Sequence, residues 1–249
     1  MIKDIVMRGK QIMKRIVSLV RRAIDEYDMI KENDRVAVGV SGGKDSLVLL
    51  AALSNLSRYH PKHFTVVGLS IDPGFGGDFA PMYEYAEKLG VEYYVKEVPL
   101  KEIIFDIRKE SNPCSLCSKM RSGALNDFAL SKGCKTLALG HHKDDVLETF
   151  FLSLLYEGRI NCFSPVTYLD RTDITKIRPL IYVRECDVKA AVRKYDVPVM
   201  PKVCPVDGST KRADMHEMIK YLEQNTTPGL KKRLFHAIQQ SGINGWKID

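Results

Sequence analysis

The stretch VAVGVSGGKDSLVLL, residues 36–50, decides the fold. It begins with an apolar, β-branched run, passes through a glycine turn and continues into a second apolar segment. A short apolar run bounded by glycines is typical of a buried strand, and the second segment is long enough for a helix. A strand that turns directly into a helix predicts a parallel α/β sheet with a ligand site where the strand ends.

The same alternation continues along the chain. Runs typical of strands cover residues 35–40, 64–71, 91–98, 135–140 and, more weakly, 174–180. Segments with helical spacing lie between them at LVLLAALSNL, APMYEYAEKLG, CSKMRSGALNDFALSKG, VLETFFLSLLYEG and CDVKAAVRKY. Apolar strands separated by helices predict a doubly wound, mostly parallel sheet with both faces covered.

Helical extensions are expected at both ends. We assign residues 1–32 to a basic amphipathic helix, 33–205 to the α/β domain and 206–249 to a C-terminal helical extension. The net charge of +7 favours an anionic partner such as nucleic acid. For the first helix, packing on the domain with a solvated basic face is the alternative. The expected RNA contacts of the C-terminal extension are Lys211, Arg212, Lys231, Lys232 and Arg233.

Composition narrows the class of protein. The 249 residues are 45% hydrophobic and 28% charged, which is ample for a buried core. The chain has no apolar run of membrane-spanning length and no signal-peptide pattern at its N-terminus, so we expect a cytoplasmic protein. Six cysteines without an export signal favour metal or redox roles over structural disulfides.

The glycine turn has the residues of a phosphate-binding loop, but it is not a Walker A loop. That motif places Ser or Thr after its lysine, whereas Asp45 follows Lys44 here. Gly42 and Gly43 let the backbone approach an anion, and the N–H groups of the following helix point toward it. The side chains that add donors or charge are Ser41, Lys44 and Ser46.

A second polar cluster follows the strand at 135–140, in the stretch GHHKDDVLETFFL. Adjacent carboxylates at Asp144 and Asp145 suit a magnesium ion, or they position Lys44, although one of them alternatively caps the helix. The histidines His141 and His142 are either catalytic bases or zinc ligands, or they fill hydrogen-bonding positions at the junction.

SGGKDS resembles the signature of the PP-loop ATP pyrophosphatases, which cleave ATP between its α and β phosphates and transfer AMP to a substrate oxygen. The resemblance implies ATP as cofactor with magnesium, and the adenine nucleotide α-hydrolase-like fold. It implies catalytic roles for Lys44, Asp45 and Asp145. The nucleotide-binding residues that it implies are Val40, Ser41, Gly42, Gly43, Lys44, Asp45, Ser46, Ile71, Asp72, Arg121, Gly140, Asp144 and Asp145.

The cysteines distinguish between reactions. Cys114 and Cys117 form a CxxC that opens a helix, and such a pair binds a metal or forms a redox disulfide. Cys204 lies in a proline-bracketed loop far along the chain. Three thiolates leave one iron of a [4Fe–4S] cluster without a protein ligand. The other cysteines, expected to be structural thiols, are Cys134, Cys162 and Cys186.

Together, the loop, PCSLC, GHHKDDVLETFF and the late cysteine loop resemble the tRNA 2-thiocytidine synthetase family over residues 12–240. The resemblance implies a [4Fe–4S] cluster held by Cys114, Cys117 and Cys204. The best-known branch has a second cysteine at the position of Asp207, so this chain belongs to another branch and the target nucleotide is open. Arg121, one turn beyond the CxxC, either bridges the nucleotide and the cluster or forms a surface salt bridge.

We therefore expect an ATP-dependent tRNA sulfurtransferase that adenylates the C2 oxygen of a pyrimidine and replaces it with sulfur by means of a [4Fe–4S] cluster. The expected base is a cytidine in the anticodon loop. Expected partners are tRNA and a sulfur donor, either a cysteine desulfurase or sulfide, and a homodimer is compatible with the sequence. The alternatives are a 2-thiouridine-forming thiolase, a lysidine- or amidotransferase-type adenylating enzyme, and a metal-bearing RNA-binding protein without catalysis.

Overall fold

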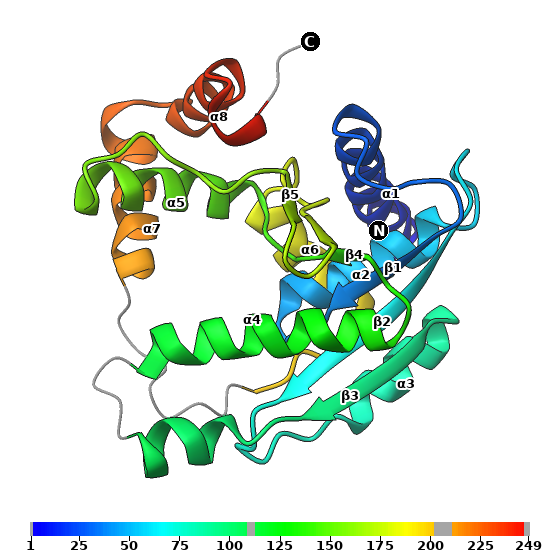
Figure 1. The fold of residues 1–249 in the computed structure, drawn as a ribbon. Coiled ribbons are helices and arrows are strands. Elements are labelled where there is room, and N and C mark those ends of the chain that lie inside the picture. Colours follow the sequence, from blue (N-terminus) through cyan, green and yellow to red (C-terminus); the bar gives the residue numbers. More distant parts are fainter. Residues whose placement is uncertain (1, 109–112, 202–210, 247–249) are drawn as a thin grey trace.

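The computed structural model describes residues 2–108, 113–201 and 211–246, with side chains from residue 11 onward. Its centre is one sheet of six strands within these residues, in the order β3-β2-β1-β4-β6-β5 (Figure 1). The strands are β1 Asp34–Gly39, β2 Phe64–Asp72, β3 Glu92–Glu97, β4 Thr136–Ala138, β5 Val166–Leu169 and β6 Ile174–Ile177. The predicted doubly wound, mostly parallel sheet is confirmed.

One strand was not expected from the sequence. β5 pairs antiparallel with β6, from Val166 opposite Ile177 to Leu169 opposite Ile174, and every other pairing is parallel. The expected strand at 174–180 is thus the second half of a hairpin and ends at Ile177. β5 lies at the sheet edge, where no neighbour on its other side demands a continuous apolar run.

Helices connect the parallel strands and extend both ends. They are α1 Ile2–Glu26, α2 Lys44–Leu56, α3 Ala80–Leu89, α4 Pro113–Ser131, α5 Lys143–Tyr156, α6 Glu185–Tyr195, α7 Lys211–Tyr221 and α8 Leu230–Gln240. Short π-helical segments cover Glu102–Ile107 and Leu222–Thr226. The described residues contain no helix that is long and apolar enough to cross a membrane.

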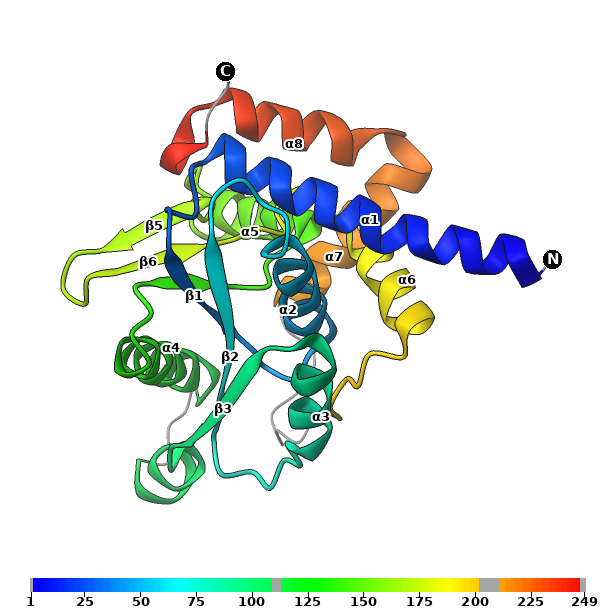
Figure 2. The same ribbon diagram turned by 90° about the vertical axis from the view of Figure 1, so that its right-hand side faces the viewer.

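The helices form two layers over the sheet. α4 covers one face, whereas α1, α2, α3 and α6 lie on the other (Figure 2). Alternation along β1 explains both contacts, because Ala37 packs under α4 while Val36 and Val38 face the opposite layer. The sheet is therefore buried on both faces, as its apolar strands require.

Both terminal extensions pack into the same core as the sheet. The indole of Trp246 meets the rings of Tyr27 and Phe235 edge-on, with centroids 6.1 and 5.6 Å away. Ile16, Val20 and Ile24 put the apolar side of α1 into this cluster, and the described basic residues of α1 lie on its exposed side.

The chain connections leave β1 and β4, which are neighbours in the sheet, toward opposite edges. The chain runs from β1 toward β2 and β3 on one side, while β4 and β6 lie on the other. Loops leaving adjacent parallel strands in opposite directions open a crevice at their carboxyl ends. The segments 40–43 and 139–142 border this crevice.

Candidate active site

The loop after β1 is held open by one serine. Ser46 Oγ donates to the carbonyl of Gly43 at 2.9 Å, and the backbone N–H of Ser41 donates to the same hydroxyl at 3.1 Å. Gly42 takes a left-handed conformation with φ of 79°, which favours glycine. A Cβ there would also come within 2.6 Å of Met200 Sδ. The loop therefore presents backbone and hydroxyl groups at the start of α2, where an anion is favoured.

Lys44 and Asp45 form an ion pair at the first turn of α2, with Nζ and Oδ2 2.9 Å apart. Lys44 also approaches Glu185 at 3.3 Å. Burial opposes the charge of Lys44, but the two carboxylates outweigh it and raise its pKa. Asp45 Oδ1 is buried and accepts no hydrogen bond from the described residues. An unpaired carboxylate oxygen beside a phosphate loop fits a magnesium ion.

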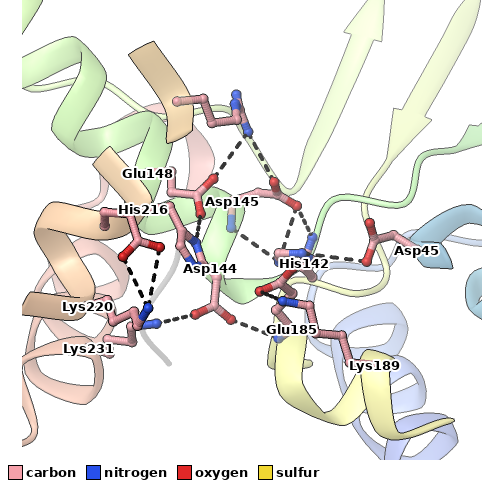
Figure 3. Close-up of polar contacts among 12 residues, drawn as sticks. Asp45, His142, Asp144, Asp145, Glu148, Glu185, Lys189, His216, Lys220 and Lys231 are labelled. Carbon is pink, nitrogen blue, oxygen red and sulfur yellow. Dashed lines mark hydrogen bonds and ion pairs between the residues drawn. The ribbon is translucent and has the colours of Figure 1, made fainter. Parts of the chain in front are cut away.

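The opposite wall is the start of α5. His142 is the N-cap: its Nδ1 accepts the N–H of Asp145 at 3.3 Å, while Asp145 Oδ2 accepts the N–H of His142 at 2.8 Å. His142 Nε2 lies 3.6 Å from Asp45 Oδ1. The two carboxylates expected to order the phosphates, Asp45 and Asp145, therefore lie on either side of one imidazole (Figure 3).

The neighbouring carboxylate Asp144 points elsewhere. Its Oδ1 binds Lys231 of α8 at 2.7 Å, and its Oδ2 accepts the N–H of Glu185 at 2.9 Å (Figure 3). Burial opposes its charge, but these contacts outweigh burial and lower its pKa. Asp144 borders none of the cavities beside the loop. Asp144 therefore connects α5 to α6 and α8, which is a structural role.

Three cavities meet at the loop, with volumes of about 480, 330 and 530 Å³. Ser41 and Arg121 line all of them. The first cavity also contains Asp45, Asp145 and an apolar floor of Leu69, Leu125, Leu137 and Leu139. The second contains Ile71 and Asp72, at the end of β2.

The third cavity contains the thiol pair. Cys114 and Cys117 lie in the first turns of α4, as the sequence predicted, and both line this cavity with Arg121 and His141. Cys117 lines the second cavity as well. Cys204 lies outside the described residues, and among those described no cluster of three metal-ligating side chains occurs. Two thiols one turn apart, beside a nucleotide-sized space, fit part of a thiolate-bound cluster.

These features agree with comparisons to known proteins. Residues 10–200 match the PP-loop domain family. A tRNA-cytidine(32) 2-sulfurtransferase of Pelobacter propionicus is 38% identical over 93% of this chain and 87% of its own length. One from Geotalea daltonii is 39% identical over 90% of each chain.

The chain belongs to the PP-loop tRNA-cytidine(32) 2-sulfurtransferase family. Among solved structures, the U34-tRNA thiolase NcsA from Methanococcus maripaludis, with its [4Fe-4S] cluster, superposes with a TM-score of 0.75. That match covers 93% of this chain and 79% of NcsA at 24% identity, and it supports the shared fold. We refer to the loop 41–46 within this domain as the PP-loop.

Most predicted residues of the PP-loop site lie together. The first cavity is lined by Val40, Ser41, Asp45, Ser46, Ile71, Arg121, Gly140 and Asp145, and the second by Gly42, Gly43 and Asp72. Lys44 contacts the site through Asp45. Arg121 forms no salt bridge with a described carboxylate, so the expected surface salt bridge is not found there.

Other residues at the PP-loop were not singled out in the sequence. Lys176 of β6 lines the first cavity and donates to Ser122 at 2.7 Å, and burial lowers its pKa. A lysine inside a short buried strand is a signal that sequence reading could have used. Glu185, which approaches Lys44, carries no such signal because a glutamate opening a helix is ordinary.

His141 lies between the PP-loop cavity and the thiol cavity. Burial, followed by the nearby Arg178 charge, lowers its pKa to about 4, so the imidazole is neutral near pH 7. Its ring packs against Phe163 with centroids 5.0 Å apart, and Nδ1 is buried without a hydrogen-bond partner among the described residues. The structure therefore shows a neutral, packed imidazole that makes no side-chain hydrogen bond to a described residue.

Two basic residues expected to contact RNA have partners within the chain. Arg212 binds Asp145 at 3.1 Å and lines the first cavity, and Lys231 binds Asp144. Lys232 is exposed, and Lys211 lies over the ring of Tyr156, 4.4 Å from its centroid. Arg233 donates to the Pro228 carbonyl. That these five side chains contact RNA stays a prediction.

Proposed function

We propose that the protein is an ATP-dependent tRNA sulfurtransferase that replaces the C2 oxygen of a cytidine with sulfur. One observation carries this proposal. The phosphate loop and the CxxC thiols open onto adjoining cavities, with Ser41 and Arg121 lining all three. Activation by ATP and delivery of sulfur must act on the same carbon, so the two sites must adjoin. The names of the family's curated relatives support the choice of cytidine.

The PP-loop performs the activation. Its backbone N–H groups, the hydroxyls of Ser41 and Ser46 and the Lys44 ammonium hold the pyrophosphate part of ATP. Attack by the cytidine C2 oxygen on the α-phosphorus forms an O–P bond and breaks the bond to pyrophosphate. Asp45 and Asp145 would hold the magnesium ion that accompanies ATP, since one oxygen of Asp45 is buried and has no hydrogen-bond partner among the described residues.

The end of β2 positions the adenosine. Ile71 lines both the first and the second cavity, and the neighbouring Asp72 lines the second. Asp72 is held in place because its Oδ1 accepts the N–H of Gly74 at 2.9 Å. The leucine side chains on the floor of the first cavity provide an apolar surface for the flat adenine ring and exclude water from it.

The thiols define the sulfur side of the site. Cys114, Cys117 and, by the resemblance, Cys204 would hold the [4Fe–4S] cluster. When bound, this cluster would supply an iron that binds the sulfur to be transferred. Sulfur at the oxidation level of sulfide would add to C2, and the C2–O bond would break as AMP leaves with the oxygen. Arg121 lines all three cavities, so its cation would offset the negative charge of the departing AMP.

The partners follow from the reaction. The substrate is the anticodon loop of tRNA, which places the enzyme in the cytoplasm, and the sulfur comes from sulfide or a cysteine desulfurase. A homodimer is compatible with this scheme. A 2-thiouridine-forming enzyme uses the same steps on another base. A lysidine-type enzyme is less consistent with the site, because an amine nucleophile has no use for the thiol pair.

The test is reconstitution without oxygen. Purified protein with ATP, magnesium, sulfide and unmodified tRNA should release AMP and pyrophosphate and form 2-thiocytidine, detected by mass spectrometry of digested tRNA. 2-Thiouridine as the product would favour the uridine alternative. AMP release without any thiolated nucleoside would remove the sulfurtransferase proposal.

A further inference from the structure

Arg212 brings a guanidinium to the PP-loop site from outside the family domain. The PP-loop domain match ends at residue 200, whereas Arg212 stands in the first turn of α7. It lines the first cavity together with Ser41, Asp45 and Asp145. The C-terminal extension therefore adds a positive charge to the nucleotide site.

Contacts fix where this guanidinium lies. Arg212 Nη1 binds Asp145 Oδ1 at 3.1 Å, and Nη2 donates to Thr149 Oγ1 at 3.3 Å. The same helix is anchored one turn further on, where His216 Nδ1 lies 2.9 Å from Glu148 Oε1 (Figure 3). Met215 and Ile219 bury the apolar side of α7. The helix is thus packed on α5 while the Arg212 side chain remains 44% exposed.

The charges around the cavity leave Arg212 available to an anion. Lys44 is already paired with two carboxylates, Asp45 and Glu185. Arg212 also lies near two carboxylates, Asp145 at 3.1 Å and Glu148 at 3.9 Å, but its side chain is 44% exposed, against 28% for Lys44. Ion pairs of exposed side chains are weak, so the guanidinium can exchange these contacts for an anion. A phosphate chain in the cavity brings several negative charges, and the planar guanidinium offers five donors suited to phosphate oxygens.

We propose that Arg212 is a further catalytic residue, which contacts the phosphate chain of ATP bound at the PP-loop. The pair with Asp145 holds the guanidinium at the edge of the cavity before ATP binds. Once ATP is bound, Arg212 stabilises the charge that develops on the phosphates as pyrophosphate leaves. This inference rests on the proposed function, because it assumes that ATP binds in the first cavity.

The experiment compares Arg212→Ala and Arg212→Lys with a matched control, Lys220→Ala. Lys220 lies on the same helix and pairs only with the exposed Glu217 among the described residues. Binding of ATP, adenosine and tRNA is measured by titration, and AMP formation by steady-state kinetics on the cluster-loaded enzyme. Circular dichroism melting verifies that each variant is folded.

For Arg212→Ala we expect ATP affinity to fall about tenfold, as for loss of one charged hydrogen-bonding side chain. Adenosine and tRNA affinity should be unchanged. The kcat for AMP formation should fall roughly 100-fold, the size typical of losing one donor to a developing charge. Added guanidinium ions should restore part of this rate, and Arg212→Lys should be intermediate. If Arg212→Ala is unfolded, the same comparison is made with Arg212→Lys.

Three results would overturn the inference. Arg212→Ala could behave like Lys220→Ala, it could lose ATP and adenosine affinity equally, or it could lose only tRNA affinity. The last result would return Arg212 to the RNA surface expected from the sequence. Failure of the proposed function is distinguishable, because the wild-type enzyme itself would then form no AMP.

Discussion

Gly140 lies directly against the backbone of the PP-loop helix: a Cβ on Gly140 would come within 2.9 Å of the Ser46 nitrogen. It would also come within 3.0 Å of the carbonyl carbon of Asp45. Real Cβ atoms do not make contacts this short, and a helix backbone does not yield as a flexible side chain does. The loop after β4 and the start of α2 are therefore in contact because residue 140 has no side chain.

Gly140→Ala should accordingly separate the two walls of the nucleotide site. We expect ATP affinity to fall at least about tenfold, corresponding to about 1.4 kcal/mol. Gly123→Ala is the matched control, because its Cβ would meet open space in the middle of α4. That control should raise helix stability by about 0.5 to 1 kcal/mol. Normal ATP affinity in Gly140→Ala, measured by titration, would contradict the close contact.

The two adjacent carboxylates of α5 should respond differently to amidation. Asp144→Asn weakens the contacts with Lys231 and Glu185, so we expect the free energy of unfolding to fall by about 2 to 3 kcal/mol. ATP affinity should persist while the variant remains folded. Asp145→Asn should instead abolish AMP formation with a smaller loss of stability. Urea denaturation and AMP assays on both variants test these expectations. If Asp144→Asn abolished AMP formation and Asp145→Asn mainly lost stability, Asp144 would be the magnesium ligand.

Helix geometry explains why the sequence alone did not separate these carboxylates. Consecutive helical residues point about 100° apart, so only one of two adjacent aspartates can face the cavity. Which one depends on how α5 is rotated, and the partners that fix this rotation, Lys231 and Arg212, come from far along the chain. The strands β1 to β4 could be predicted because their apolar runs need no such partner. β5 could not, because none of its residues is fully buried and Tyr168 is exposed.

The half-buried imidazole of His141 predicts a pH dependence of stability. Its folded-state pKa is about 4, below the ordinary value of 6.5, so the unfolded chain binds its proton more tightly. Stability from the neutral imidazole is therefore complete above pH 6.5 and is lost as the pH falls toward 4. We expect this loss to be on the order of 2 kcal/mol. His141→Gln should lack it, as measured by urea denaturation between pH 7 and 4, whereas parallel curves would argue against a half-buried, neutral His141.

If the thiols hold a [4Fe–4S] cluster, the protein should be coloured and sensitive to oxygen. Protein purified without oxygen should be brown, should contain about four irons per chain and should bleach in air. Cys114→Ser, Cys117→Ser and Cys204→Ser should each end thiolation and leave ATP binding intact. Cys186→Ser is the control, because this thiol is exposed on α6 away from the cavities. If the protein were colourless, contained stoichiometric zinc and were fully active, the thiols would bind zinc and the cluster proposal would be wrong.

If this chain places sulfur on a tRNA cytidine, the modified nucleosides of cellular tRNA must depend on it. Total tRNA is digested and analysed by mass spectrometry from three strains: the parent, a deletion strain, and the deletion strain carrying Asp145→Asn. We expect 2-thiocytidine in the tRNA of the parent strain and none in the tRNA of the deletion strain or of the strain carrying Asp145→Asn. Two results would contradict a cytidine sulfurtransferase. The deletion strain could keep its 2-thiocytidine, or it could lose 2-thiouridine instead of 2-thiocytidine.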